Sequence, residues 1–81
     1  MGSTLEEKKI LIGLNITYYR KARRLTQIEL ADQLEVSSNY LSQIERGSKS
    51  ISLTKLIKVA ELLDIDAKAL LDFSRFSKDS E

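Results

Sequence analysis

A polar strip on one predicted helix is the part of this sequence best suited to chemistry. The stretch 37–46 predicts a helix on which hydrogen-bonding side chains recur on one face: Ser38, Asn39, Ser42, Gln43 and Arg46. At 100° per residue these side chains fall within an arc of about 140°. Asn and Gln can each pair with adenine through two hydrogen bonds, and Arg can pair with guanine in the same way. The strip is therefore suited to reading base edges in the major groove of DNA.

The same strip could also be an ordinary polar surface. A solvated helix face usually mixes Glu with Lys, whereas Glu45 lies at the edge of this arc and no acid lies within it. A second predicted helix, 26–34, precedes the strip with only Glu35 and Val36 between them. Such a short turn forces two short helices to cross steeply. This two-helix unit favours the DNA interpretation over the plain surface.

The elements that must position the strip are all helical. Thr4 with Glu7 and Thr26 with Glu29 each form a predicted capping box, and Gly47 can supply the left-handed residue that ends a helix. Periodicity predicts helices at 5–23, 26–34, 37–46, 52–63 and 66–73. We expect an all-α fold with one compact five-helix domain over 1–76, a helix-turn-helix at about 26–47, and a flexible tail at 77–81.

Composition argues against an enzyme. The chain has 81 residues, with no Cys and no His, and its 12 acidic residues are scattered along the sequence. Zinc sites and Ser-His-Asp or Cys-His nucleophiles need those missing residue types. We therefore expect no catalytic residues, no metal, no cofactor and no small-molecule ligand.

The net charge says little about function, but the positions of the basic residues are informative. The net charge is +1, and four basic residues gather at Arg20, Lys21, Arg23 and Arg24. Such a cluster suits either a phosphate-facing patch or a solvated helix end. No apolar run approaches the roughly 18 residues that a membrane span needs. We expect a cytoplasmic protein without membrane contact.

A motif with many matching points covers the segment 26–47 and its flanks. It comprises Thr26-Gln27, Glu29-Leu30-Ala31, Leu34, Val36-Ser37, Tyr40-Leu41-Ser42 and Ile44-Glu45-Arg46-Gly47, with Ile16, Arg20 and Arg24-Leu25 upstream and Ser52-Leu53 and Leu56 downstream. These residues resemble the helix-turn-helix of the phage repressor and Cro family, also called the XRE family. The resemblance implies a lambda-repressor-like domain that binds operator DNA, normally as a homodimer on a palindromic site.

The resemblance also implies roles for individual residues. Gln27 would contact a phosphate, although simple helix capping is compatible with that role. Tyr40 either packs in the core or extends its hydroxyl to the DNA backbone. The DNA-binding set that the resemblance implies is Gln27, Ser37, Ser38, Asn39, Tyr40, Ser42, Gln43, Arg46, Ser48 and Lys49. Within it, Ser38, Asn39, Ser42 and Gln43 are the candidates for base contacts.

Two further expectations come from the family pattern. Arg20 and Glu45 would form a partly buried ion pair that holds the third helix on the first. The turn between helices two and three usually has Gly where this chain has Glu35, so we expect a positive φ at Glu35 and a gain in stability from Glu35→Gly. Another frequent Gly of the family is replaced by Asp64.

The C-terminal part is the predicted dimer surface. Leu70, Phe73 and Phe76 crowd this end, and two aromatic side chains are more than a small monomer needs. The alternative is that both Phe side chains fold back onto helices one and four.

Two classes of function remain open from the sequence. The leading interpretation is a sequence-specific transcriptional regulator, such as a small phage or plasmid repressor or a restriction-modification controller protein. The alternative is a helix-turn-helix module that binds a protein partner, such as a toxin or a polymerase subunit.

Overall fold

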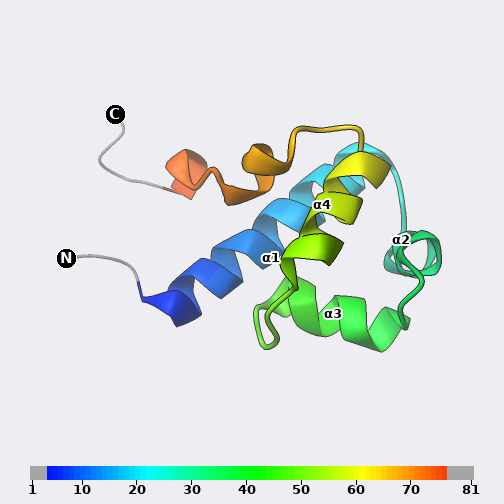
Figure 1. Ribbon diagram of the computed structural model, residues 1–81, viewed down its shortest axis with the longest axis horizontal. Helices are drawn as coiled ribbons and strands as arrows, with labels where there is room; N and C mark the ends of the chain where they lie inside the picture. Colours follow the sequence, from blue (N-terminus) through cyan, green and yellow to red (C-terminus); the bar gives the residue numbers. More distant parts are fainter. Residues whose placement is uncertain (1–3, 77–81) are drawn as a thin grey trace.

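The computed structural model describes residues 4–76, in which helices are joined by short loops and no strand occurs. Four α-helices are followed by two short 3-10 helices: α1 (Leu5–Ala22), α2 (Gln27–Leu34), α3 (Ser38–Arg46), α4 (Leu53–Leu62), η1 (Ala67–Leu71) and η2 (Ser74–Phe76). Figure 1 shows α1 running through the molecule, with α3 on one side of it and the 3-10 segment on the other. The predicted all-α class is confirmed, whereas the predicted tail at 77–81 lies outside the described residues.

The helix starts follow the predicted caps. The backbone amide of Thr4 donates to Glu7 Oε1 at 2.8 Å, and the amide of Glu7 donates to Thr4 Oγ1 at 3.1 Å. Thr26 and Glu29 form the same reciprocal pair. Because both capping boxes satisfy backbone donors that the helix itself leaves unpaired, they fix where α1 and α2 begin.

The core draws on every α-helix and on η1. Its apolar side chains are at most 6% exposed: Ile16, Leu30, Ala31, Leu34, Leu41, Ile44, Leu56, Val59, Ala60, Leu63 and Leu70. The core therefore places α3 on α1 and α2 while leaving the polar strip of α3 outside.

The fifth predicted helix, at 66–73, is present, but it is shorter than expected and is a 3-10 helix rather than an α-helix. This stretch forms the 3-10 helix η1, and Asp66 caps it by accepting from the amide of Lys68 at 3.1 Å. The buried Asn15 side chain of α1 donates to the carbonyls of Leu70 and Asp72, each at 3.1 Å. We attribute the difference to these bonds, because the two carbonyls are satisfied by α1 instead of by a further helical turn.

The last described residues fold back along α1. Arg75 donates to Asn15 Oδ1 at 2.6 Å, and its guanidinium lies 4.0 Å from the ring centroid of Tyr18. Asp72 accepts a hydrogen bond from the amide of Ser74 at 3.0 Å, which lowers the pKa of the Asp72 carboxyl below its ordinary value. These contacts fix 72–76 beside the middle of α1.

Three residues other than glycine have left-handed backbone conformations. The φ angles are 60° at Arg24, 64° at Glu35 and 58° at Asp64. The positive φ expected at Glu35 is thereby confirmed, and Asp64 shows the same backbone at the second position where the family often has Gly. Arg24 was not expected to adopt this conformation.

Candidate nucleic-acid interface

The polar strip of α3 lies on the surface because the opposite face of the helix is buried. Leu41 and Ile44 are at most 2% exposed, and the hydroxyl of Ser37 caps the helix by accepting from the amide of Tyr40 at 3.0 Å. The strip itself divides by exposure. Ser38, Asn39 and Arg46 are exposed, whereas Ser42 and Gln43 are half-buried.

Glu45 holds α3 in place through four hydrogen bonds. Arg20 donates through Nε to Oε2 at 2.8 Å and through a terminal nitrogen to Oε1 at 3.0 Å. The Arg20 and Glu45 side chains are only 8% and 4% exposed. A second terminal nitrogen of Arg20 donates to the carbonyl of Leu25 at 2.7 Å. The structure thus brings together the two residues that the sequence analysis paired, and it links α3 to α1 and to the start of the loop before α2.

Gln27 also contacts Glu45. Its side-chain nitrogen donates to Glu45 Oε1 at 2.9 Å, so in this structure the Gln27 side-chain amide is directed toward the ion pair. Its backbone amide still lies at the N-terminus of α2, where a positive partial charge favours anions. A phosphate contact by Gln27 therefore stays a prediction.

The sequence analysis missed two residues that support this site. Thr17 donates to Glu45 Oε1 at 2.9 Å, and an added Cβ on Gly13 would lie 2.5 Å from the carbonyl oxygens of Ile44 and Glu45. Signals for both were present in the sequence. Thr17 lies three residues before Arg20 on the same helix face, and a glycine inside a helix costs about 1 kcal/mol and so usually indicates close packing.

The end of α3 and the loop after it continue the polar surface. Arg46 donates to the hydroxyl of Ser42. Ser48 binds the carbonyl of Gln43 through its amide at 3.0 Å and its hydroxyl at 3.2 Å. The ammonium of Lys49 lies 6.0 Å from the ring centroid of Tyr40, which is itself half-buried. Strip and loop together form one continuous surface without an exposed acid, which we call the α3 strip: 37–39, 42–43, 46 and 48–49.

The residues that form this site lie in a segment that matches a known protein family. The family model described as helix-turn-helix, HTH_3, matches residues 16–70. The chain belongs to this family. The match includes both helices of the HTH_3 motif, the Arg20–Glu45 pair and the whole α3 strip. It leaves out the first half of α1 and the segment after residue 70.

Relatives of the chain carry names of regulators. The immunity repressor protein of Bacillus phage phi105 is 36% identical over 70 residues, which is 86% of this chain and 49% of the repressor. The control protein C.BamHI of Bacillus amyloliquefaciens is 31% identical over 67 residues, covering 82% of this chain and 83% of the control protein. The HTH_3 chain thus spans about half of the phage repressor and most of the control protein.

Solved structures share the fold. The crystal structure of SinR, a master regulator for biofilm formation, in complex with DNA superposes with a TM-score of 0.70 at 40% identity. The alignment covers 75% of this chain and 98% of the SinR chain.

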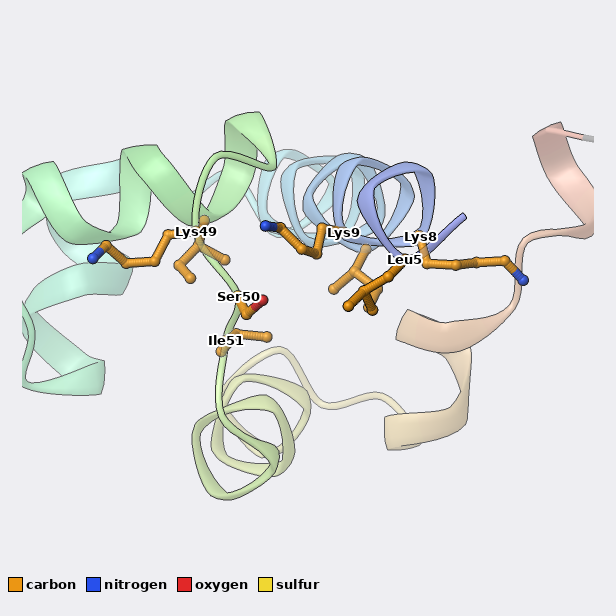
Figure 2. A pocket seen from close by; sticks show the side chains of 8 residues that line it. Leu5, Lys8, Lys9, Lys49, Ser50 and Ile51 are labelled. Atoms are coloured by element: carbon orange, nitrogen blue, oxygen red, sulfur yellow. The ribbon is translucent and has the colours of Figure 1, made fainter. Parts of the chain in front are cut away.

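A hollow beside the HTH_3 motif does not form a polar site. It has a volume of about 170 Å³ and lies between α1 and the loop after α3, lined by Leu5, Lys8, Lys9, Ile12, Ile44, Lys49, Ser50 and Ile51. Figure 2 shows the amines of Lys8 and Lys49 pointing away from one another. Lys8 lies 4.9 Å from the ring centroid of Phe73, and Lys9 pairs with Glu6 at 3.2 Å.

The described residues contain neither a metal-binding group nor a membrane-spanning helix. Among residues 4–76, no group of His, Cys, Asp and Glu could hold a metal ion. Within the same range, no helix is both long and apolar enough to cross a bilayer.

The predicted dimer surface needs a correction at Leu70. This side chain is 0% exposed and belongs to the core, because η1 turns it inward against α1 and α4. It cannot contact a second copy while the domain is folded. Phe73 and Phe76 are half-buried against α1, where Lys8 covers the Phe73 ring and Phe76 lies near Ile10.

Proposed function

We propose that this chain is a sequence-specific transcriptional regulator that inserts α3 into the major groove of double-stranded DNA. One observation carries the proposal: the α3 strip is polar and free of acids, with Ser38, Asn39 and Arg46 exposed, while Glu45 on the same helix is fixed by Arg20 at 2.8 Å. Pre-organised side chains lose little conformational entropy on binding. The strip therefore presents base-reading groups from a helix whose orientation is already set.

The relatives support this function. They include proteins named as a phage immunity repressor and a control protein, and SinR was solved in complex with DNA. A regulator of this kind acts where the DNA is, so we place the protein in the cytoplasm and assign it no enzymatic activity.

The residues divide between reading bases and positioning the helix. Asn39 and Gln43 have the amide groups that recognise adenine, and Arg46 can pair with guanine or with the backbone. Ser38 and Ser42 are short, and they suit phosphate or water-mediated contacts. The remaining positioning contacts come from the caps and the loop: Gln27, Ser37, Tyr40, Ser48 and Lys49.

The proposed binding unit is a homodimer on a palindromic operator. One recognition helix covers few base pairs, whereas a two-fold dimer places two of them about 34–36 Å apart, one turn of DNA. Of the C-terminal residues predicted to form the dimer contact, Phe73 and Phe76 keep part of their surface accessible.

Selection of bound sequences from a random DNA pool, followed by anisotropy titrations across salt, tests the proposal. If the chain binds DNA, the logarithm of the affinity should fall linearly with the logarithm of the salt concentration. The slope should be about −0.9 for each phosphate contacted. The selected sequences should contain an inverted repeat. Recovery of no enriched sequence, with affinity that does not respond to salt, would contradict the proposal and favour the protein-interaction module instead.

A further inference from the structure

The middle of α1 has an unusual solvent-facing side. Between Lys8 and Arg20 only three residues are exposed, and all are large and apolar or aromatic: Ile10 at 45%, Leu14 at 44% and Tyr18 at 52%. They follow one another at intervals of four, so they form a single stripe along the helix. A surface helix normally places charged or polar residues on this side. The stripe of Ile10, Leu14 and Tyr18 thus resembles a helix–helix contact that residues 4–76 leave uncovered.

The stripe has a negative charge at one end and a positive charge at the other, each at the same distance in sequence from Leu14. Glu7 lies seven residues before Leu14, and Lys21 lies seven residues after it; Ile10 and Tyr18 lie four residues to either side. All five fall within an arc of about 80° at 100° per residue. If a second copy of the helix ran antiparallel with Leu14 at the two-fold axis, Glu7 would face Lys21 twice and Ile10 would face Tyr18 twice.

The surface next to the stripe is shaped to accept a side chain. A shallow hollow of about 340 Å³ is lined by Glu7, Ile10, Leu11 and Phe76. In the antiparallel arrangement the Tyr18 ring of the second copy would lie opposite Ile10, beside this hollow. On its own chain, Tyr18 is supported by Arg75, whose guanidinium stacks at 4.0 Å and is held by Asn15 at 2.6 Å.

The position of the stripe separates it from the DNA-binding machinery. The side of α1 that faces α3 contains Gly13, about 100° around the helix from Leu14. Ile10 and Leu14 also lie outside residues 16–70, the part that the family model matches, whereas Tyr18 lies within it.

We propose that this chain self-associates through the α1 stripe, pairing antiparallel with the same stripe of a second copy. A single helix face buries less than the roughly 1,200 Å² of a stable interface. The association is therefore weak and depends on concentration. It rests on the homodimer proposed above and extends that contact from Phe76, which lines the hollow beside Ile10, onto α1. A substitution at Leu14 leaves Phe73 and Phe76 unchanged, so loss of the stripe contact can be distinguished from loss of the C-terminal contact.

Sedimentation equilibrium of the full chain over a wide concentration range tests the contact. Leu14→Glu brings two like charges together at the axis, and we expect at least about a tenfold loss of association. The matched control is Leu53→Glu, since Leu53 is 70% exposed on α4; it should leave association unchanged. A Leu14 variant that associates as tightly as the wild type, or a loss of association in the Leu53 variant alone, would overturn the stripe contact and leave the proposed homodimer standing. A wild-type chain that stays monomeric would overturn both.

Cross-linking tests the antiparallel geometry. Because the chain has no Cys, single substitutions report on one contact each. Leu14→Cys should form a disulfide-linked dimer readily, whereas Leu53→Cys should not. A mixture of Ile10→Cys and Tyr18→Cys chains should give mostly the mixed dimer, which mass spectrometry resolves by its intermediate mass. A preference for the Ile10–Ile10 dimer would contradict the antiparallel arrangement, even if association itself were observed.

Discussion

Glu45 is the residue on which the orientation of α3 depends most. Its carboxylate accepts from Arg20, Thr17 and Gln27, and its side chain is 4% exposed. An ionised carboxylate in such a position is stable only while its partners remain, because an unpaired buried charge is strongly unfavourable.

Removing one partner of this pair should therefore be costly. We expect Arg20→Ala to lower the free energy of unfolding by about 3–5 kcal/mol, since it leaves Glu45 buried without its main donor. The matched control is Lys21→Ala on the exposed side of the same helix, which should change stability by less than about 0.5 kcal/mol. Urea denaturation of both variants measures the difference. Equal stability of the two would show that the pair does not stabilise the fold.

Glu35 illustrates a local strain that the sequence already indicated. Its φ is 64°, a conformation that costs a residue other than Gly roughly 1–2 kcal/mol. Part of the gain from Glu35→Gly is lost to the greater freedom of Gly in the unfolded chain. We expect a net stabilisation of about 0.5–1 kcal/mol, visible as a melting temperature a few degrees higher.

Asp64 provides the comparison for this substitution. Its φ is 58°, but Asp tolerates the left-handed region better than Glu does. Asp64→Gly should therefore gain less than Glu35→Gly in the same thermal melts. A lower melting temperature for Glu35→Gly would contradict the assigned turn.

Residue-level sequence reasoning succeeded where short-range chemistry decides the outcome. The capping boxes at Thr4 and Thr26 depend on neighbours within a few positions, whereas the left-handed Glu35 was expected from the family pattern. The direction of the Gln27 side chain was not predictable in the same way. It depends on Glu45, which is 18 positions away in the chain.

The contact between α1 and α3 depends on a glycine. At Gly13 a Cβ would lie 2.5 Å from two backbone carbonyl oxygens of α3. Helix propensity alone predicts that Gly13→Ala stabilises α1 by roughly 0.5–1 kcal/mol. Backbone atoms cannot move aside as flexible side chains do, so overpacking should dominate with a cost of about 1–3 kcal/mol.

We therefore expect Gly13→Ala to destabilise the domain and to move α3 relative to α1. Urea denaturation gives the sign of the change, and chemical-shift differences in the NMR spectrum should concentrate at 41–47. If the variant were more stable than the wild type, α1 and α3 would not approach as closely as the structure shows.

The helices themselves were predictable, but the nature of the last one was not. Apolar periodicity gives the position of η1 but not its hydrogen-bonding pattern, because that pattern depends on the Asn15 amide reaching the carbonyls of Leu70 and Asp72. The same long-range contacts bury Leu70, which removed it from the predicted dimer surface.

Over the whole molecule, the features divide into two parts. The helix-turn-helix and its ion pair fall within the family match at 16–70, and both were foreseen from the sequence. The segment 72–76, which lies outside this match, packs on the middle of α1 through contacts of Arg75 with Asn15 and Tyr18. Sequence reasoning could not predict these contacts, since the residues that make them are separated by about sixty positions.

The central claim is that Asn39 and Gln43 read base edges from the α3 strip. We expect the double variant Asn39→Ala, Gln43→Ala to lose most of its preference for the selected operator, because each lost bidentate contact is worth about 1–3 kcal/mol of discrimination. Binding to a scrambled duplex should change little, because phosphate contacts carry no sequence information. Gln33→Ala, an exposed amide removed from α2, is the matched control.

Fluorescence-anisotropy titration of the two variants and the wild type, on operator and scrambled duplexes at one salt concentration, is the decisive measurement. The account predicts that the ratio of the two affinities collapses toward one for the double variant and is preserved for Gln33→Ala. A double variant that keeps the wild-type affinity ratio would show that α3 does not read the operator, and would contradict the account.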